Sequence, residues 1–463
     1  MSHTRRDFIR QTGCALVGGG MLAAGIQDFG LVNALAQSSA TDYRALVCVF
    51  MSGGSDGNNM LVPTDDRYTG YSTARSAAGL AIPQAGQPGG LLPLNGVPYG
   101  VHPSLAGLQA LFNDGKCAVL TNVGPLIEPL TKSTYQSGGR RPAQLFSHSD
   151  QVAQWQASEA TNVSQTGWGG RVADRTGTLN GAATFPQMIS IAGISLFVTG
   201  QATRPLAISD SRTALANVLP LTLTGSAAEI ASRRTAFDQI RALAGGSLIK
   251  ASADVTSSAL QTSAALATAN VTLTIDFPNT TLGYQLEQIA RLVKLRDTLG
   301  MKRQIFFCNV GGFDTHSNQM AVNGQGALLL QVGDAIKAFY DEMVAQGVSD
   351  KVTTFTHSDF GRTLQPAGSG AAVGSDHAWG SHHFIVGGSV NGGRLFGTFP
   401  TLQLGGPDDT DSNSNPRGRW IPTTSVEQYA ATLATWYGLS PNDLTTVFPF
   451  ITRFSSANLG FMI

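Results

Sequence analysis

The stretch LVCVFMSGGSDG, residues 46–57, decides the fold. It is an apolar run of strand length that ends in three glycines around one carboxylate, Asp56. Glycines at the end of a strand let the backbone turn sharply or approach a ligand closely. The stretch therefore predicts a buried strand that either delivers Asp56 to a site or ends in a tight turn with a solvated aspartate.

Similar strand-like runs recur along the chain and alternate with segments of helical periodicity. The runs lie at 45–50, 116–121, 188–192, 303–309, 351–357 and 383–387, and the helical segments at 104–113, 227–244, 281–299 and 325–346. This alternation predicts an α/β fold with a mostly parallel central sheet and helices on both faces. Residues 248–275, rich in Ser, Ala and Thr, are interpreted as a helical insertion in preference to a flexible loop or an interaction face.

Residues 1–36 have the pattern of a twin-arginine signal peptide. Arg5 and Arg6 precede a short apolar stretch, and Ala34-Leu35-Ala36 fits a cleavage site. The apolar stretch is shorter than the roughly 20 residues that a membrane span needs. We expect recognition by the twin-arginine export machinery and a periplasmic or secreted mature protein. Because no internal repeat or Pro-rich linker follows, residues 37–463 are predicted to form a single domain.

The composition excludes several classes of partner. The 30 basic residues equal the 30 acidic residues, so neither nucleic acid nor an anionic membrane is an expected partner. No later apolar run is long enough to span a bilayer. Cys48, Cys117 and Cys308 each lie in a strand-like run, which predicts buried free thiols rather than disulfides. The sequence does not indicate an oligomeric state.

Chemistry-bearing motifs lie directly beside the predicted strands. GGFDTH at 311–316 and HSDFGRT at 357–363 follow strands, and GSDHAWGSHH at 374–383 comes immediately before one. Ligands of parallel α/β sheets bind beyond the carboxyl ends of the strands, so these motifs are expected to share a site. Carboxylates and imidazoles together suit divalent ions with mixed oxygen and nitrogen donors. The expected cofactor is such an ion, with zinc, manganese and calcium as candidates.

Two pairs are the leading candidate ligands. Asp314 and His316 form the first pair, with a polar loop that caps a helix as the alternative. Asp376 and His377 form the second, joined by His382 or His383, with hydrogen bonding behind the ligands as the alternative. His102, just before a helical segment, is interpreted as structural.

At this level the sequence resembles a known family. The motifs GGSDGNNMLVP, VHPSLAGLQALF, SHSDQVAQW, GGFDTHSNQ, SDFGRT and GSDHAWGSHH, together with the twin-arginine signal, resemble the exported bacterial domain-of-unknown-function family 1501. That family is related to the alkaline phosphatase and sulfatase superfamily but has no settled biochemistry, so the resemblance implies a fold and a kind of site rather than a substrate.

The superfamily resemblance implies a set of metal ligands. The positions that match are Asp56, Asp314, His316, Asp359, Asp376, His377 and His382. Asp56 matches the aspartate after the first strand, and Asp359 lies in Ser-Asp-Phe-Gly where the superfamily commonly has Ser-Asp-His-Gly. Phe360 therefore replaces a usual histidine, and a site that lacks this ligand holds one ion or none unless Asp376 and His377 compensate.

The resemblance also directs attention to a nucleophile and an anion-binding residue. Ser147 and Ser149 lie at the start of a helical segment, where the helix dipole favours phosphate or sulfate. Plain helix capping is the alternative for both serines. Arg362 could bind the anion through two N–H groups, with a salt bridge to a neighbouring aspartate as the alternative.

These observations support two functions of different classes. The first is an exported metal-dependent hydrolase of small phosphate or sulfate esters, with attack by a serine oxygen. The second is a non-catalytic envelope or extracellular protein that keeps the phosphatase-like scaffold, which Phe360 favours. An oxidoreductase partner, suggested by the export route, lacks a dinucleotide-binding glycine loop and a cysteine cluster.

Overall fold

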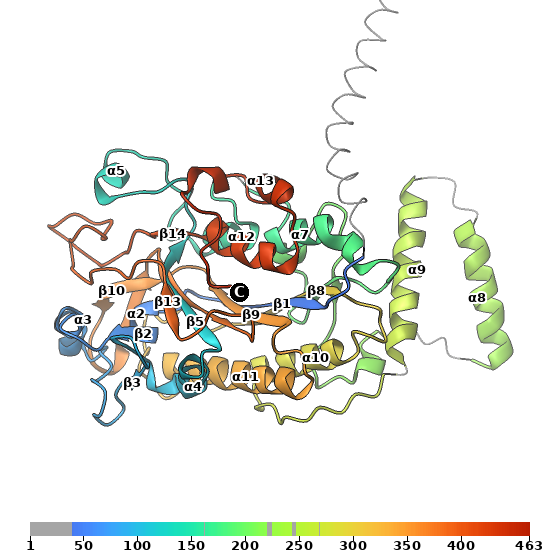
Figure 1. Cartoon of the computed structure of the whole chain (residues 1–463), viewed down its shortest axis with the longest axis horizontal. Coiled ribbons are helices and arrows are strands. Elements are labelled where there is room, and N and C mark those ends of the chain that lie inside the picture. Colours follow the sequence, from blue (N-terminus) through green and yellow to red (C-terminus); the bar gives the residue numbers. More distant parts are fainter. Residues whose placement is uncertain (1–38, 162, 220–224, 243–246, 268) are drawn as a thin grey trace, which may run out of the picture.

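The structure is a computed structural model that describes residues 39–463 apart from 162, 220–224, 243–246 and 268 (Figure 1). The predicted signal peptide, residues 1–36, lies outside the described residues. The described chain forms an α/β fold around one large sheet, with helices above and below it.

Nine strands of the described chain form the central sheet. Its order is β13-β5-β12-β9-β1-β8-β6-β7, and β14 also pairs with β5. The strands are β1 (Arg44–Met51), β5 (Cys117–Gly124), β6 (Met188–Ser190), β7 (Leu206–Ala207), β8 (Arg303–Val310), β9 (Val352–Ser358), β12 (Ser381–Val386), β13 (Arg394–Phe396) and β14 (Thr424–Ser425). The neighbours β8 and β9 both run parallel to β1, and β12 is antiparallel to β9 and β5.

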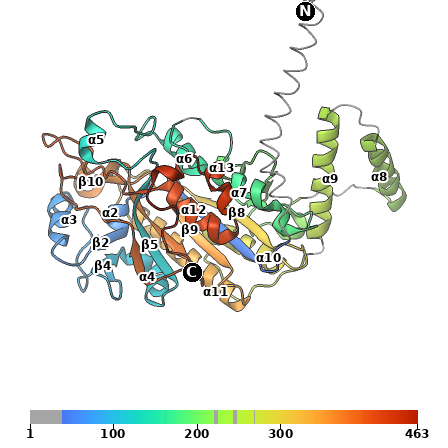
Figure 2. The ribbon, with the colours of Figure 1, turned by 45° about the horizontal axis from the view of Figure 1, so that its top comes forward.

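The alternation of side chains along β1 explains why both faces of the sheet are covered. Val47 and Val49 belong to one hydrophobic core, whereas Leu46, Cys48 and Phe50 belong to another. Successive side chains of a strand point to opposite faces, so a continuously apolar strand needs apolar partners on both sides. The first core includes residues of α4 (Ala106–Asn113), α10 (Thr281–Lys294) and α11 (Gln325–Ala345). The second includes residues of α6 (His148–Ala157), α7 (Trp168–Thr176), α12 (Val426–Tyr437) and α13 (Leu444–Val447) (Figure 2).

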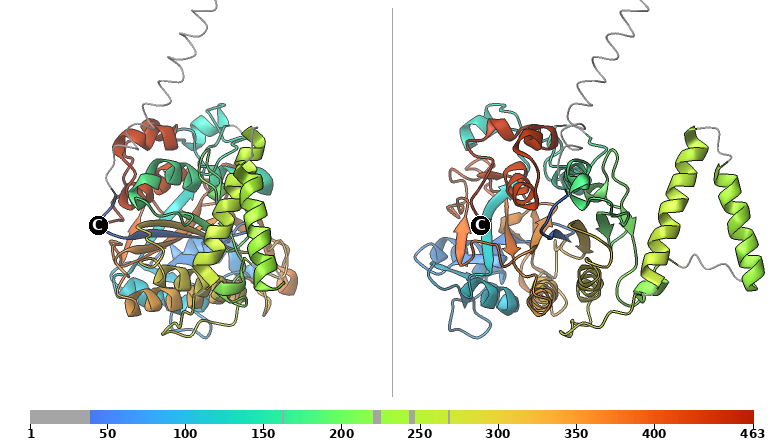
Figure 3. Two further views of the ribbon diagram at one scale, coloured as in Figure 1. Left: turned by 90° about the vertical axis from the view of Figure 1, so that its right-hand side faces the viewer. Right: turned by 45° about the vertical axis from the view of Figure 1, so that its right-hand side comes forward.

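The remaining elements lie around this layered centre. Two small sheets are formed by β2 (Leu61–Pro63), β4 (Tyr99–Val101) and β3 (Leu92–Pro93), and by β10 (Arg362–Ala367) with β11 (Gly374–His377). Helices α2 (Gly57–Met60) and α3 (Tyr68–Arg75) contact these small sheets, and the short helix α5 (Lys132–Gln136) follows β5 along the chain. Helices α8 (Ala227–Ala242) and α9 (Ser247–Ala267) stand to one side of the sheet (Figure 3), so the interpretation of residues 248–275 as a helical insertion is confirmed for most of that segment.

The predicted strands are all present, and the mostly parallel sheet is confirmed. The antiparallel direction of β12 follows from the path of the chain. After β9 the chain forms the β10–β11 hairpin and then enters β12 at Ser381, which pairs with Val123 near the carboxyl end of β5. Because this connection begins and ends at the same edge of the sheet, β12 runs opposite to its neighbours. All the motifs after strands therefore meet at one edge.

The three cysteines of the described chain are free and buried, as expected, and burial raises the pKa of each thiol. Among the described residues, no helix is both long enough and apolar enough to cross a membrane.

A buried acid in α12 makes the stability of the fold depend on pH. Glu427 is 2% exposed; its Oε1 accepts a hydrogen bond from the Phe450 N–H, and its Oε2 has no partner among the described residues. Burial raises its pKa from 4.5 to about 8, although the Phe450 bond and the charges of Arg171 and Arg453 act to lower it. The folded protein therefore binds this proton more tightly than the unfolded chain does.

We expect the stability contributed by this proton to be complete below about pH 4.5 and to be lost as the pH rises to about 8. The Glu427→Gln variant, which mimics the protonated acid, should lack this part of the pH dependence. Urea unfolding of both proteins between pH 5 and pH 9 measures the difference. Parallel pH profiles for the two proteins would contradict this assignment of the proton to Glu427.

Candidate metal centre

The loops after β1, β8 and β9 are in close contact at the carboxyl edge of the sheet. Gly53 and Gly54 have left-handed φ angles of 116° and 81°. A Cβ atom at Gly53 would lie 2.3 Å from the Asp314 nitrogen, and one at Gly54 would lie 2.4 Å from the Phe360 ring. Only glycine allows this approach. The glycines of the opening stretch therefore let three loops meet.

Arg362 joins the same loops through its guanidinium group. The side chain is fully buried, and its Nε and Nη1 donate to the carbonyls of Gly54 and Ser375, both at 2.8 Å. Its Nη2 donates to the Gly53 carbonyl and to Asp314 Oδ1. Of the two roles considered for Arg362, the salt bridge to a neighbouring aspartate is the one seen in the structure.

Asp56 lies in a buried polar network instead of facing the histidines. Its two carboxylate oxygens accept from Arg75 at 2.6 and 3.1 Å, and Oδ2 also accepts from Gln319 Nε2 at 2.6 Å. The Asp56 and Arg75 side chains are both 0% exposed. A buried ion pair of this kind leaves an uncompensated charge when one partner is removed. In this structure Asp56 therefore anchors α3 to the first loop.

Histidines and one aspartate converge beside these loops. Ligand atoms of His148, Asp314 and His377 all lie within 4.8 Å of one another. The Nε2 atoms of His148 and His377 are each 3.5 Å from Asp314 Oδ1. His316 joins the group, with its Nε2 3.2 Å from Asp314 Oδ1 and 2.8 Å from His377 Nε2. Of the four residues expected to share one site, Asp314, His316 and His377 lie together here, and Asp376 contacts His316 from behind.

Each imidazole is held by its other nitrogen. His148 Nδ1 lies 2.7 Å from Asp359 Oδ2, His316 Nδ1 lies 2.7 Å from Asp376 Oδ1, and His377 Nδ1 lies 2.8 Å from the Phe146 carbonyl. Carboxylate and carbonyl oxygens only accept hydrogen bonds, so each Nδ1 carries a proton. In the neutral rings the lone pair is then on Nε2, the atom that faces the cluster.

This donor set fits a metal ion. Two Nε2 lone pairs 2.8 Å apart repel each other unless a positive charge lies between them. His148 Nε2 is buried and has no hydrogen-bond partner among the described residues. In a tetrahedral zinc site with ligand bonds of about 2.0–2.1 Å, ligand atoms are about 3.3 Å apart. The distances of 3.2 and 3.5 Å from Asp314 Oδ1 to the histidines are close to this value.

The charges around the cluster keep its ligands in the metal-binding form. Burial acts to raise the pKa of Asp314, but the hydrogen bond and charge of Arg362 outweigh burial, and the pKa lies below its usual range. Burial lowers the pKa of His377, which the charge of Arg362 reinforces, although the bond to Phe146 opposes this shift. Asp314 is therefore ionised and His377 neutral near pH 7, as metal binding requires.

Other predicted ligands lie behind or away from the cluster. Asp359 accepts from the Gly53 N–H and from His148, and Asp376 pairs with His316 and Arg417. These carboxylates orient the rings, which was the alternative considered for Asp376. His382 is buried, accepts from the Asn122 N–H at 3.1 Å and stacks on Phe399.

Burial lowers the pKa of His382 to about 3, although Asp56 acts in the opposite direction. His383 is also buried, and its Nδ1 lies 3.3 Å from Thr356 Oγ1. Neither ring belongs to the group of converging ligand atoms. His102 caps the short helical turn Pro103–Leu105 by accepting from the Ser104 N–H, in agreement with its structural interpretation.

The candidate nucleophiles flank one of the converging histidines. Ser147 is the residue before α6 but makes no capping hydrogen bond; its Oγ donates to Asp150 Oδ2 at 2.6 Å. Ser149 Oγ is 3.1 Å from Ser147 Oγ and 3.2 Å from the same carboxylate oxygen. The Ser147 side chain is therefore oriented by a carboxylate rather than used to cap the helix.

Sequence reasoning missed His148. Its ring centroid lies 4.3 Å from that of His377 and 4.8 Å from that of Phe360. Phe360 thus packs against the cluster at the position where a histidine was expected. His148, the first residue of α6, supplies an imidazole instead. The sequence did contain a signal for His148, because this residue lies between the two candidate nucleophiles Ser147 and Ser149. Arg75 and Arg417, which pair with Asp56 and Asp376, were also missed.

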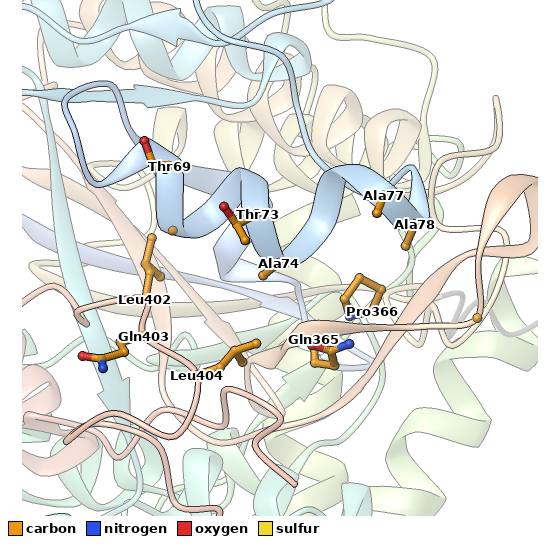
Figure 4. Close-up of a pocket in the computed structure, with 12 residues that line it drawn as sticks. Thr69, Thr73, Ala74, Ala77, Ala78, Gln365, Pro366, Leu402, Gln403 and Leu404 are labelled. Carbon is orange, nitrogen blue, oxygen red and sulfur yellow. The ribbon is translucent and has the colours of Figure 1, made fainter. Parts of the chain in front are cut away.

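A groove on the surface is separate from this cluster (Figure 4). It has a volume of about 540 Å³ and lies between α3 and β10, where Ala74 lies opposite Leu404 and the following Ala77 and Ala78 lie opposite Pro366. None of the converging residues lines it. The chemistry of the side chains, rather than the size of a hollow, therefore places the candidate site.

The fold and the cluster together define an α/β protein with a candidate metal centre at the carboxyl edge of a mostly parallel sheet. The chain belongs to the family described as "Protein of unknown function (DUF1501)", whose model matches residues 43–415. The comparison with curated proteins gives no match.

Solved structures that resemble the chain include a zinc-bound periplasmic domain, a sulfatase and an alkaline phosphatase. One is the C-terminal periplasmic domain of EcEptC from Escherichia coli in complex with zinc, with 11% identity, coverage of 87% of each chain and a TM-score of 0.33. Another is the sulfatase PsFucS1 from Pseudoalteromonas sp., with 9% identity, coverage of 84% of this chain and 71% of that chain, and a TM-score of 0.31. An alkaline phosphatase from the Antarctic bacterium TAB5 matches with 10% identity, coverage of 78% and 96%, and a TM-score of 0.23. At these TM-scores the matches assign no activity to this chain.

The cluster generates a graded prediction for metal affinity. His148→Ala removes a ligand and should weaken zinc binding by more than the roughly 10- to 100-fold loss that is typical when a residue behind a ligand is changed. Asp359→Asn keeps the ligand but weakens its orientation, and should fall within that range. Competition with a chromophoric chelator measures both affinities, with Ser149→Ala as the control. Equal affinities in all three variants would exclude His148 as a ligand.

Proposed function

We propose that this protein is an exported metal-dependent hydrolase of phosphate or sulfate esters. The observation that carries the proposal is the convergence of His148 Nε2, Asp314 Oδ1 and His377 Nε2 within 4.8 Å. With His316 off the ion, these three protein ligands are typical of a catalytic zinc site, which keeps a fourth position open; with His316 bound, the four ligands would make a closed, structural site. The bound ion would supply Lewis-acid stabilisation for the oxygen atoms of the ester.

The protein's own groups prepare the site for an anion. Asp359, Asp376 and the Phe146 carbonyl orient the three rings, so no ring has to turn when substrate arrives. The N-terminus of α6, a helix of 10 residues, starts at His148, and its dipole favours negative charge there. The N–H groups of Arg362 donate to protein oxygens, so in this proposal Arg362 positions Asp314 and does not bind the ester.

Ser147 is the better of the two candidate nucleophiles. Its Oγ donates to Asp150 Oδ2 at 2.6 Å, whereas the Ser149 contact with the same oxygen is 3.2 Å. A carboxylate that accepts the hydroxyl proton orients the serine oxygen and makes it more nucleophilic. Ser147 is also next to His148, so its oxygen lies at the same helix end as the proposed ligand.

One observation favours the non-catalytic alternative. Phe360 is fully buried and packs on the rings of His148 and His377, at centroid distances of 4.8 and 4.6 Å. An aromatic ring in this place occupies space near the ligands and offers no donor atom. In this alternative the same cluster binds a structural ion in a protein of the cell envelope or exterior.

Activity assays separate the two functions. With zinc, manganese or calcium bound, the mature protein should hydrolyse 4-nitrophenyl phosphate or 4-nitrophenyl sulfate. His148→Ala should lower the rate by several orders of magnitude while the protein stays folded, because it removes a proposed ligand that is 34% exposed at its side chain and leaves the Asp314–Arg362 ion pair in place. Ser147→Ala should be similarly inactive and Ser149→Ala should remain active. A metal-loaded protein that is inactive on both esters would favour the structural role.

Export is tested separately. Replacing Arg5 and Arg6 by lysines should retain the precursor in the cytoplasm, because the twin-arginine pair is the expected recognition element. Cell fractionation and immunoblotting measure the distribution, and Arg10→Lys is the matched control. Normal processing of the double-lysine variant would show that another route exports the protein.

A further inference from the structure

The backbone of Phe146 has a conformation that its side chain disfavours. Its φ angle is 72°, in the left-handed region that glycine adopts readily and bulky residues rarely adopt. Asn122 and Asn318 also have positive φ angles, but asparagine tolerates that region better. Strained backbone in a native structure persists only where the surroundings enforce it, and it concentrates at functional sites.

The surroundings of Phe146 do enforce it. The guanidinium carbon of Arg419 lies 4.4 Å from the centroid of the Phe146 ring. The ring also packs against the small core formed by Leu126, Trp379 and Ile421. A cation over an aromatic face and apolar contacts together fix the ring in place. The backbone must then follow the ring.

This conformation acts on two of the converging ligands. The Phe146 carbonyl accepts the hydrogen bond from His377 Nδ1 at 2.8 Å, which leaves His377 Nε2 unprotonated and 3.5 Å from Asp314 Oδ1. The chain continues from Phe146 through Ser147 into α6, whose first residue is His148. The turn at Phe146 therefore points a carbonyl at His377 and also sets the start of α6, the helix that carries His148.

We propose that Phe146 is a positioning residue of the metal centre, and that Arg419 holds it in its left-handed conformation. The inference rests on the proposed metal site. Packing of the Phe146 ring offsets the backbone strain, and the carbonyl direction selects the Nε2 lone pair of His377. Asp376 also bonds to one converging histidine, His316, and precedes another, His377, but it lies in the strand β11, whereas Phe146 has a positive φ.

The test compares variants in which the backbone at residue 146 is free of strain with variants in which the aromatic ring still holds it. Phe146→Gly adopts positive φ without strain but loses the clamp, so the turn becomes mobile and zinc affinity should fall by about 10- to 100-fold. Phe146→Tyr keeps the ring and should bind zinc like the native protein. Arg419→Gln keeps Phe146 but removes the cation, and should shift affinity in the same direction as Phe146→Gly, which provides a second variant if the glycine variant folds poorly.

The opposite end of α6 offers a matched control. Ser158 also has a positive φ, 51°, at the residue after the helix. Ser158→Gly relieves the same kind of strain far along the helix from His148, and should leave zinc affinity unchanged. If Phe146→Gly lowers the melting temperature but binds zinc as tightly as Ser158→Gly and the native protein do, Phe146 is only a packing residue and the inference is wrong.

A second readout does not need the metal. Nitrogen-15 NMR of the metal-free protein should show His377 as a single tautomer with the proton on Nδ1, and as a mixture in Phe146→Gly; His377→Ala assigns the signals. An unchanged tautomer in the glycine variant would overturn the inference. If His377 responds as expected but the native protein takes up no zinc, manganese or calcium, the positioning role stands and the proposed metal-dependent function fails.

Discussion

The buried guanidinium group of Arg362 is the constraint on which the functional edge of this fold depends. A charge that is fully removed from water must find several hydrogen-bond acceptors, and Arg362 finds them on three separate segments: the loop after β1, the loop after β8, and β11. Asp314 is the only charged partner of Arg362 within the described part of the chain. The group that fastens the loops together therefore also fixes the carboxylate around which the imidazoles gather, so the stability of the edge and the geometry of the site have the same source.

A second consequence concerns the division of labour among the acidic residues. Asp314 faces the imidazole nitrogens directly, whereas Asp359 and Asp376 contact the protonated nitrogens of His148 and His316. Asp56 is further removed and neutralises Arg75 inside the protein. Four aspartates that look equivalent in the motifs thus have three physical roles. The role of each aspartate depends on the cation or N–H group that it contacts. Burial alone does not distinguish the four.

Much of the fold could be predicted from the sequence, because the strands are short apolar runs bounded by glycine and the helices have clear periodicity. The meeting of Asp314, His316, Asp376 and His377 followed from the rule that parallel strands end at one edge. The place of His148 could not be predicted in this way, since it arrives on a helix whose start depends on the strained turn at Phe146. The pairing of Asp56 with Arg75 joins a strand end to a helix, and no local pattern specifies a partner across such a gap.

The buried thiols make the redox conditions during folding important. Cys48 and Cys308 lie on the adjacent strands β1 and β8, where Cys48 pairs in register with Phe307 and Val49 with Cys308. Packing shields both thiols once the sheet is assembled, but an extended chain in an oxidising compartment would expose them to disulfide formation with each other or with Cys117. In the proposed export route, folding in a reducing compartment before transport would keep the thiols reduced, and unfolding after transport would expose them to oxidation and become irreversible.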